Sequence, residues 1–358
     1  MAKNYSYYEQ QTMENTRRLR ELIKELPPYA ADFFRGIEPT TSARTRIGYA
    51  YDIKIFYRFL VQNNPCFKDK KIEEIMLSDL ENLTAQDMDE FLEYLKLYET
   101  ENGEIHKNEE RGRHRKMSSL RKYFNFFNKR QMLKNNPAIL VDMPKIHEKE
   151  IIRLDPDEVA KLLDLVEKGG ENLTKMQKVY YEKNKYRNLA IFTLLLGTGI
   201  RISECVGLNI HDLDFKNDRI KIIRKGGKED FVYFGDEVHD ALLKFLEEER
   251  NHMEAKLDRD KDALFLSSQK KRMSVRSIEV MVSDYAKQIT TIKHITPHKL
   301  RSTYGTTLYR ETSDIYLVAE VLGHNDVNTT KKHYAALDED LKRRASRVVR
   351  LREDDSDK

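Results

Sequence analysis

Hydrophobic residues recur at helical spacing through the first third of the chain. After Ser42, whose hydroxyl group suits an N-terminal cap, apolar residues three and four positions apart predict a helix. Thr84 begins a second helix of this kind, with Asp87 at the third position of a capping box. The basic run at 111–116 opens a third helix. We therefore expect only helices between residues 40 and 134.

The helical pattern breaks between residues 135 and 154. Two prolines and a charged stretch make this segment a predicted linker between two domains. Beyond the linker, Pro156 suits the first turn of a new helix. Residues 186–196 are apolar on nearly all sides of a further helix, and a helix of that kind is expected to be buried.

One stretch in the second half of the chain has the hydrophobic pattern of β-strands. Apolar residues at 220–223 and 231–234 flank the turn Lys225-Gly226-Gly227-Lys228, in which glycine supplies the positive φ of a hairpin. A third short strand is expected at 263–266. The remaining segments predict helices at about 237–255, 274–288, 297–311, 313–322 and from 329 onward. The expected fold class is mostly α with a small antiparallel β-hairpin or sheet.

The composition excludes several classes of protein. With 358 residues, of which 39% are hydrophobic and 35% charged, the chain suits two globular domains. Its two cysteines, Cys66 and Cys205, are too few for a disulfide framework and form no zinc-binding pair. The start of the chain is polar, and the longest apolar run, 189–196, is far shorter than the ~20 residues that span a bilayer. We expect a cytoplasmic protein.

The position of the positive charge is more informative than its total. The 64 basic and 60 acidic residues leave a net charge of +4, which is modest for a nucleic-acid-binding protein. Arg201, however, follows Gly197 and Gly199 and precedes a new helix, where acidic residues are preferred. An arginine there suits an anion held by its guanidinium group and free backbone amides, and a surface arginine is the alternative.

Two further basic segments have simple alternatives. Lys225 is either an ordinary turn lysine or a phosphate contact, and its surroundings lack the features of a nucleotide-binding loop. His298 and Arg301 lie three residues apart after a Thr-Pro helix start, so both can reach one anion. A metal site formed by His294 and His298 is disfavoured, because Pro297 leaves His294 outside the helix and no carboxylate completes the ligand set.

Two residues complete the set of candidates. His324 follows Gly323, whose place after a helix predicts a C-terminal cap, and a surface histidine is the alternative. Tyr334 is one of 19 tyrosines and needs strong positive charge nearby to act as a nucleophile. Two arginines, a lysine and two histidines gathered with a tyrosine would form a cationic site. Such a site suits a pentacoordinate phosphorane, which carries extra negative charge.

The order of these residues resembles the tyrosine recombinase, or phage integrase, family, and within it the Xer-like two-domain site-specific recombinases. The resemblance rests on Arg201, Lys225, His298-x-x-Arg301, Leu322-Gly323-His324 and Tyr334, within the strings T-G-I-R-I-S-E, K-G-G-K, T-P-H-K-L-R and L-G-H-N-D-V-N-T-T. It covers the catalytic half throughout and residues 40–147 more weakly. Tyr334 lies ten residues after His324, where many members have nine.

The resemblance implies a role for each residue. Tyr334 would attack the scissile phosphodiester to give a 3′-phosphotyrosyl bond, and Lys225 would protonate the leaving 5′-oxygen. Arg201 and Arg301 would bind the non-bridging oxygens of the phosphate. Glu204 would orient the site without contacting the DNA. His298 would assist deprotonation of the tyrosine and bind the phosphate, and His324 would donate a hydrogen bond to the transition state. No cofactor and no metal are expected.

The resemblance also implies a domain organisation. Residues 1–36 would form an N-terminal helical extension, 37–147 a helical core-binding domain, 148–350 an α+β catalytic domain, and 351–358 a charged tail. The core-binding domain would supply DNA contacts, and a solvated charged face is the alternative for about half of these residues. The candidates are Arg44, Arg46, Arg113, Lys116, Arg121 and Lys122.

The expected activity is site-specific recombination of double-stranded DNA by a homo-tetramer on two synapsed duplexes. The protein would be nucleoid-associated when bound, with accessory directionality proteins as further partners. Integration or excision of a mobile element is the first candidate role, and Xer-like resolution of chromosome or plasmid dimers is the second. A type IB topoisomerase and a non-catalytic DNA-binding protein are the alternatives from other classes.

Overall fold

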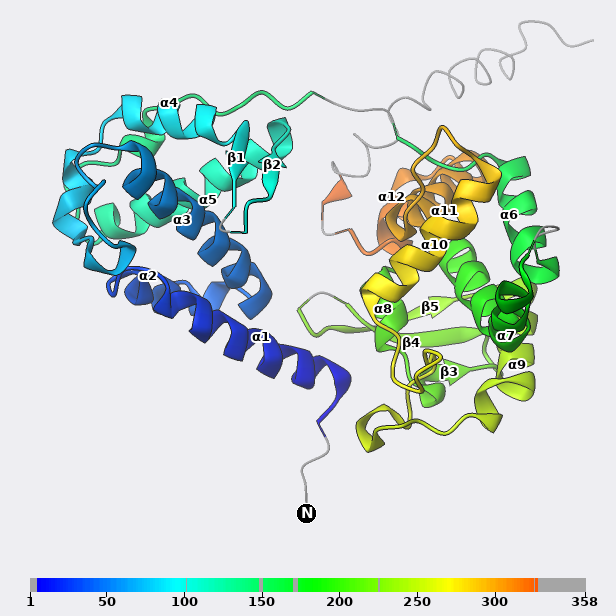
Figure 1. The fold of residues 1–358 in the computed structure, drawn as a ribbon. Coiled ribbons are helices and arrows are strands. Elements are labelled where there is room, and N and C mark those ends of the chain that lie inside the picture. The colour runs from blue at the N-terminus through cyan, green and yellow to red at the C-terminus, as the bar shows by residue number, and fades with distance from the viewer. Residues whose placement is uncertain are drawn as a thin grey trace, which may run out of the picture. The chain divides into compact units, whose positions relative to one another are not determined.

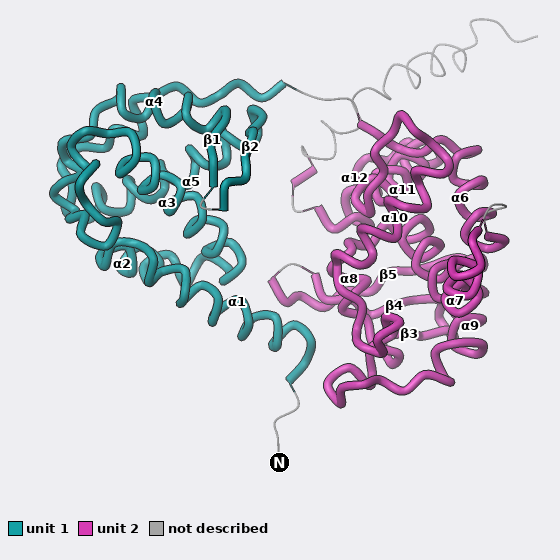
Figure 2. The backbone as a smooth tube through the Cα atoms, viewed as in Figure 1, with its two compact units in different colours: residues 1–149 teal, residues 150–358 magenta. Residues whose placement is uncertain are grey.

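The computed structural model describes residues 5–100, 102–147, 151–169, 173–224, 226–324 and 326–327. Within these ranges the chain is mostly helical and carries two small antiparallel sheets (Figure 1), which confirms the expected fold class. The chain divides into two compact units, residues 1–149 and residues 150–358 (Figure 2). Four parts of the expectation lie outside the described residues: Lys225, the helix from 329 onward, Tyr334 and the tail 351–358.

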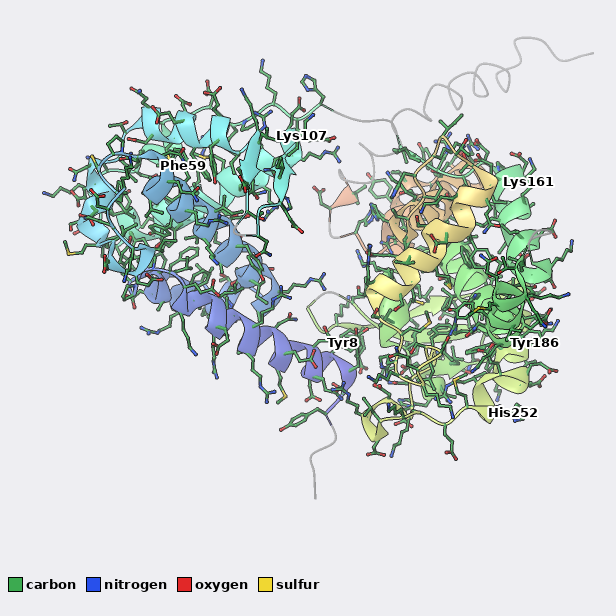
Figure 3. All side chains as sticks on the ribbon, in the orientation of Figure 1. Tyr8, Phe59, Lys107, Lys161, Tyr186 and His252 are labelled. Atoms are coloured by element: carbon green, nitrogen blue, oxygen red, sulfur yellow. The ribbon has the colours of Figure 1, made fainter. Side chains whose placement is uncertain are left out.

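Unit 1 is a set of helices packed around an aromatic core. Ser42 and Thr84 cap their helices as expected, each accepting a hydrogen bond from the backbone amide three residues later. Phe59, labelled in Figure 3, packs against Phe91 with their ring centroids 5.3 Å apart. The helices are α1 (Tyr7–Lys24), α2 (Ala30–Gly36), α3 (Ala43–Asn63), α4 (Ala85–Tyr94) and α5 (Glu110–Lys129).

The first two helices share this core. Leu19 and Leu22 of α1 and Phe33 of α2 are buried among residues of α3 and α5. The Phe33 ring meets the Tyr123 ring of α5 edge-on, with centroids 5.0 Å apart. The segment 1–36 therefore contributes apolar side chains to the core of unit 1.

Unit 1 also contains a short hairpin, so the expectation of helices alone between residues 40 and 134 was wrong. β1 (Leu97–Glu99) and β2 (Ile105–Lys107) pair in antiparallel fashion, with Tyr98 opposite His106. Of the residues in these two strands only Tyr98 is buried. Strands of this length with one inward side chain give no periodic hydrophobic signal, which explains the error.

Unit 2 is arranged around α7 (Lys175–Thr198), which contacts α6, α8, α9 and α11. The stretch 186–196, expected to be buried, supplies most of the buried residues of this helix. The other helices are α6 (Pro156–Lys168), α8 (Ile202–Gly207), α9 (Asp236–Glu248), α10 (Val275–Ile289), α11 (Pro297–Thr312) and α12 (Ile315–Val321).

The sheet of unit 2 contains the expected hairpin. β4 (Arg219–Ile223) and β5 (Glu229–Tyr233) are antiparallel, and Gly226 and Gly227 in their turn have φ of +92° and +84°. The third strand is β3 (Leu213–Asp214), next to β4. The expected strand at 263–266 was wrong. Its apolar residues are buried, but they meet loop segments through isolated bridges and have no extended partner strand.

α9 ends at Glu248, short of the expected residue 255. Arg250 follows and is buried at 5% exposure. Its guanidinium group donates hydrogen bonds to the carbonyl oxygens of Met253, Lys261 and Ala263. These bonds stabilise a segment after Glu248 that is not α-helical, although the helical periodicity of the sequence continues there.

None of the helices in the described ranges is both long enough and apolar enough to cross a membrane.

A buried ion pair in unit 1 gives a test of this fold. The Asp52 carboxylate is fully buried, and its partner Arg115 donates to both carboxylate oxygens at 2.5 and 2.7 Å. We expect Arg115→Ala to lower the free energy of unfolding by about 1–3 kcal/mol, because a buried charge loses its partner. Urea denaturation at pH 7 measures this loss. The control is Arg35→Ala, which removes an exposed pair with Asp32 and should cost less than about 0.5 kcal/mol.

The pH dependence of this loss identifies its cause. Burial raises the pKa of Asp52 in the folded protein. The folded state then binds more protons than the unfolded state between the two pKa values, so stability falls as pH rises through that window. The deficit of Arg115→Ala should therefore shrink as the pH is lowered from 7 toward 4. A deficit that stays constant over this range would show that the Asp52 charge is not responsible.

Candidate active site

Arg201 is positioned by the end of one helix and the start of the next. α7 ends at Thr198, and Gly199 follows with φ of +62°. A Cβ atom on Gly199 would lie 2.4 Å from Cδ1 of Tyr304, so the turn requires glycine for both its conformation and its space. Arg201 then forms the N-cap of α8 with its side chain 32% exposed.

Glu204 binds both ends of Arg201. Its buried carboxylate accepts the backbone N–H of Arg201 at 2.7 Å and the Nη1 group of the same residue at 2.9 Å. The sequence suggested an external anion held by the guanidinium group together with free amides. The amide of Arg201 is instead occupied by Glu204.

Arg301 lies in the second turn of α11. Thr296 is the N-cap and Pro297 the first residue of this helix, as expected. The Arg301 side chain is buried at 4% exposure, and its guanidinium group donates to the carbonyl oxygens of Gly199, at 2.5 Å, and Leu322. These two bonds connect the α11 side chain to the turn before Arg201 and to the end of α12.

His324 is positioned by a backbone turn. Gly323 follows α12 with φ of +59°, as the expected C-terminal cap requires. The amide of His324 donates to the carbonyl oxygen of Ala319 at 2.9 Å, and the amide of Gly323 donates to that of Glu320 at 2.8 Å. His324 is half-buried.

Three arginines converge on the end of α12. Consecutive carbonyl oxygens, which have no partner within the helix, each accept a hydrogen bond from a different guanidinium group. The pairs are Val321 with Arg224 at 3.0 Å, Leu322 with Arg301, and Gly323 with Arg201 at 2.9 Å. The structure thus brings Arg201 and Arg301 together beside His324.

Of the three remaining expected residues, the structure describes only His298. His298 is exposed on the first turn of α11, three residues before Arg301. Lys225 and Tyr334 lie outside the described residues. Between β4 and β5, the Arg224 amide donates to the carbonyl oxygen of Lys228 at 2.8 Å.

Arg224 is a residue of the site that sequence reasoning missed. It follows β4 directly, and its side chain is 9% exposed. Its Nε group donates to Asp230 of β5 at 3.0 Å, and its Nη1 atom lies 3.6 Å from the Glu204 carboxylate. An arginine at the end of one hairpin strand, with an acidic residue on the facing strand, is the signal that could have indicated it.

Two of the six residues expected to contact DNA make hydrogen bonds that fit a structural role in unit 1. Lys116 is buried and donates to Oδ1 of Asn108 at 2.6 Å, and burial lowers the pKa of Lys116. Arg121 donates to the carbonyl oxygens of Ala138 and Val141. These contacts fit structural roles, so we leave both residues out of the proposed DNA-binding surface.

The other four basic residues differ in exposure. Arg44 is exposed in the first turn of α3, and Arg113 on α5 is half-buried. Arg46 pairs with a glutamate at 3.3 Å, and Lys122 lies over a tyrosine ring at 5.1 Å from its centroid. The Arg46 side chain is 11% exposed, and Lys122 is half-buried.

Acidic and metal-ligating side chains are sparse around the site. Across the described ranges, no group of three or more His, Cys, Asp or Glu side chains is placed to hold a metal ion. His294 is exposed in the loop before α11, whereas His298 is in the helix, so the two belong to different segments. The described site combines guanidinium and imidazole groups with the buried carboxylate of Glu204.

Known proteins share this sequence pattern. The phage integrase family profile matches residues 153–340. Tyrosine recombinase XerC of Caldanaerobacter subterraneus subsp. tengcongensis is 31% identical over 314 residues, which cover 85% of this chain and 82% of that protein. Tyrosine recombinase XerC of Bacillus pumilus is 31% identical over 321 residues, covering 89% and 92%.

Solved structures share the fold at lower identity. The XerH site-specific recombinase bound to its palindromic difH substrate has a TM-score of 0.61 at 20% identity, covering 85% of this chain and 80% of that one. The Tn1549 transposon integrase in complex with a circular intermediate DNA has a TM-score of 0.61 at 18% identity, covering 87% and 98%. The profile matches more than half of the chain and the XerC proteins align with most of it, so the chain belongs to the phage integrase family and is a tyrosine-type site-specific recombinase.

Proposed function

We propose that this protein exchanges strands between two specific DNA sites through a 3′-phosphotyrosyl intermediate. The observation that carries the proposal is the convergence of Arg201, Arg301 and His324 at the end of α12. Arginines oriented by backbone carbonyls direct positive charge to one place, which suits a scissile phosphate that gains negative charge as it is attacked.

The chemical step balances without a cofactor. The phenolic oxygen of Tyr334 forms a bond to phosphorus, and the bond from phosphorus to the 5′-oxygen breaks. Lys225 supplies the proton to the leaving 5′-oxygen, and His298 helps remove the tyrosine proton. The energy of the broken phosphodiester bond is retained in the bond between tyrosine and phosphorus. A 5′-hydroxyl group of another strand can therefore attack this phosphorus, release the tyrosine and complete the exchange.

Unit 1 would supply binding affinity. The exposed Arg44, with the half-buried Arg46, Arg113 and Lys122, would contact phosphates of the duplex. Such contacts position a protein on DNA and make its affinity fall steeply with salt. Recombination would take place in a homo-tetramer on two synapsed duplexes, because each strand exchange needs two cleaved sites.

Two biological uses fit this chemistry. Integration or excision of a mobile element is the first, and the fold shared with the Tn1549 transposon integrase is compatible with it. Resolution of chromosome or plasmid dimers is the second, and it is supported by the named XerC relatives at 31% identity. Sequencing the DNA trapped covalently on the protein in its host separates them. Junctions of a mobile element indicate integration, whereas a single chromosomal site indicates dimer resolution.

Substitution of the nucleophile is the direct test of the chemistry. Tyr334→Phe keeps the ring and removes the attacking oxygen, so we expect unchanged DNA binding and no covalent adduct on a nicked suicide substrate. A covalent adduct persisting in this variant would contradict the assignment. With two labelled sites, the unaltered protein should give recombinant product, whereas relaxation alone would indicate a topoisomerase.

The arginines are tested by cleavage rate. We expect Arg201→Ala and Arg301→Ala each to slow single-turnover cleavage by about 100-fold or more, because each removes charge-assisted bonds from the transition state. Arg276→Ala is the control, since that side chain is 81% exposed on α10. A loss below about 10-fold, with folding and DNA binding intact, would place the phosphate elsewhere.

A sulfur-substituted substrate separates Lys225 from Lys228, which is exposed in the same turn. If Lys225 protonates the leaving oxygen, Lys225→Ala should be severely slow on the normal phosphodiester. Its rate should recover on a 5′-bridging sulfur substrate, because a thiolate leaves without a proton. Lys228→Ala should lose little on either substrate. Rescue of Lys228→Ala alone would reverse the assignment.

A further inference from the structure

Arg224 contacts three elements around the site: the end of α12, strand β5 and Glu204 of α8. Its Nη2 group donates to the carbonyl oxygen of Val321 at 3.0 Å, and its Nε group donates to Asp230 at 3.0 Å. Its Nη1 atom lies 3.6 Å from Oε2 of Glu204 and, among the residues that the structure describes, has no hydrogen-bond acceptor. The side chain is 9% exposed, so these contacts replace most of its hydration.

The Glu204 carboxylate is shared between two arginines. Oε1 accepts from the guanidinium group of Arg201, and Oε2 accepts the Arg201 amide while facing Arg224. Glu204 is 3% exposed, so its charge acts at short range through little water. If Arg201 were its only partner, the two charges would cancel. Arg224 places a second positive charge beside Glu204. Its own partner Asp230 is 42% exposed, so water screens that carboxylate more than it screens Glu204, and part of the charge of Arg201 stays available to a phosphate.

The guanidinium group of Arg224 also packs against the turn that precedes His324. A Cβ atom on Gly323 would lie 2.8 Å from Cζ of Arg224, so this close approach depends on glycine. Because Arg224 binds the Val321 carbonyl at the same time, it fixes both the last turn of α12 and the residue next to His324. The hairpin is thus joined to the catalytic turn through one side chain.

We propose that Arg224 is a positioning residue for phosphate activation: it shares Glu204 with Arg201 and holds the Val321–Gly323 turn, so that Arg201 and His324 face the scissile phosphate with their charge and direction fixed. This inference rests on the proposed function. Arg224 acts through these groups, and the charge it provides affects the non-bridging oxygens of the phosphate rather than its leaving group.

Three DNA substrates distinguish this role from a purely structural one. They carry at the scissile position a normal phosphodiester, a methylphosphonate with one non-bridging oxygen replaced by a neutral methyl group, or a 5′-bridging sulfur. We expect Arg224→Ala to cleave the phosphodiester about 10- to 100-fold more slowly than the unaltered protein. The deficit should fall below about 5-fold on the methylphosphonate, which needs less positive charge, and remain on the sulfur substrate.

Arg219→Ala is the matched control. Arg219 lies on the same strand, pairs with Asp214 at 2.8 Å and covers the Phe231 ring, and it contacts none of the groups named above. It should cleave all three substrates within about 3-fold of the unaltered protein. Thermal melting and DNA binding are measured for each variant, so that loss of folding is recognised.

The outcomes are decisive in each case. An equal deficit of Arg224→Ala on phosphodiester and methylphosphonate would overturn the proposal, as would rescue by the bridging sulfur, which would assign Arg224 to protonation of the leaving group. If Arg224→Ala does not fold, Arg224→Lys replaces it, because a single ammonium group cannot reach Asp230, Val321 and Glu204 together. An unaltered protein that forms no covalent adduct would overturn the proposed function. A normal adduct with full activity of Arg224→Ala would overturn this inference alone.

Discussion

The site depends on guanidinium groups that are held by backbone carbonyl oxygens. A carbonyl fixes the direction of an arginine through a hydrogen bond, but it carries only a partial charge and so leaves the positive charge in place. Three such bonds gather at the end of α12. The carboxylates that touch these arginines, Glu204 and Asp230, are outnumbered by the guanidinium groups, so the described cluster keeps a net positive charge.

This arrangement places strict demands on the chain. The carbonyl oxygens are available because two helices end in left-handed glycines, Gly199 and Gly323, each packed closely against a side chain. One of these glycines directs its carbonyl to Arg301, and the other directs its own to Arg201. The backbone conformation of each turn therefore determines the orientation of an arginine on a different segment.

The sequence could predict the elements whose signals are local, and it could not predict those that depend on distant partners. The caps at Ser42 and Thr84, the glycine hairpin and the turn before His324 follow from side-chain and φ preferences, and the structure has all of them. The prediction of a strand at 263–266 was wrong, because a strand needs a partner strand and the local hydrophobic pattern does not show whether one is present. The involvement of Arg224 was equally hidden, since its acceptors lie as far away as Val321, 97 residues along the chain.

The anchoring of the arginines so late in the sequence has a consequence for synthesis. Arg201 and Arg224 are synthesised about a hundred residues before the carbonyl oxygens at 321–323 that bind them. A nascent chain or a fragment ending before α12 carries every arginine of the cluster and can form the bond from Arg301 to Gly199, but it lacks these three acceptors. The complete arrangement of the arginines therefore forms only after the end of α12 has been synthesised.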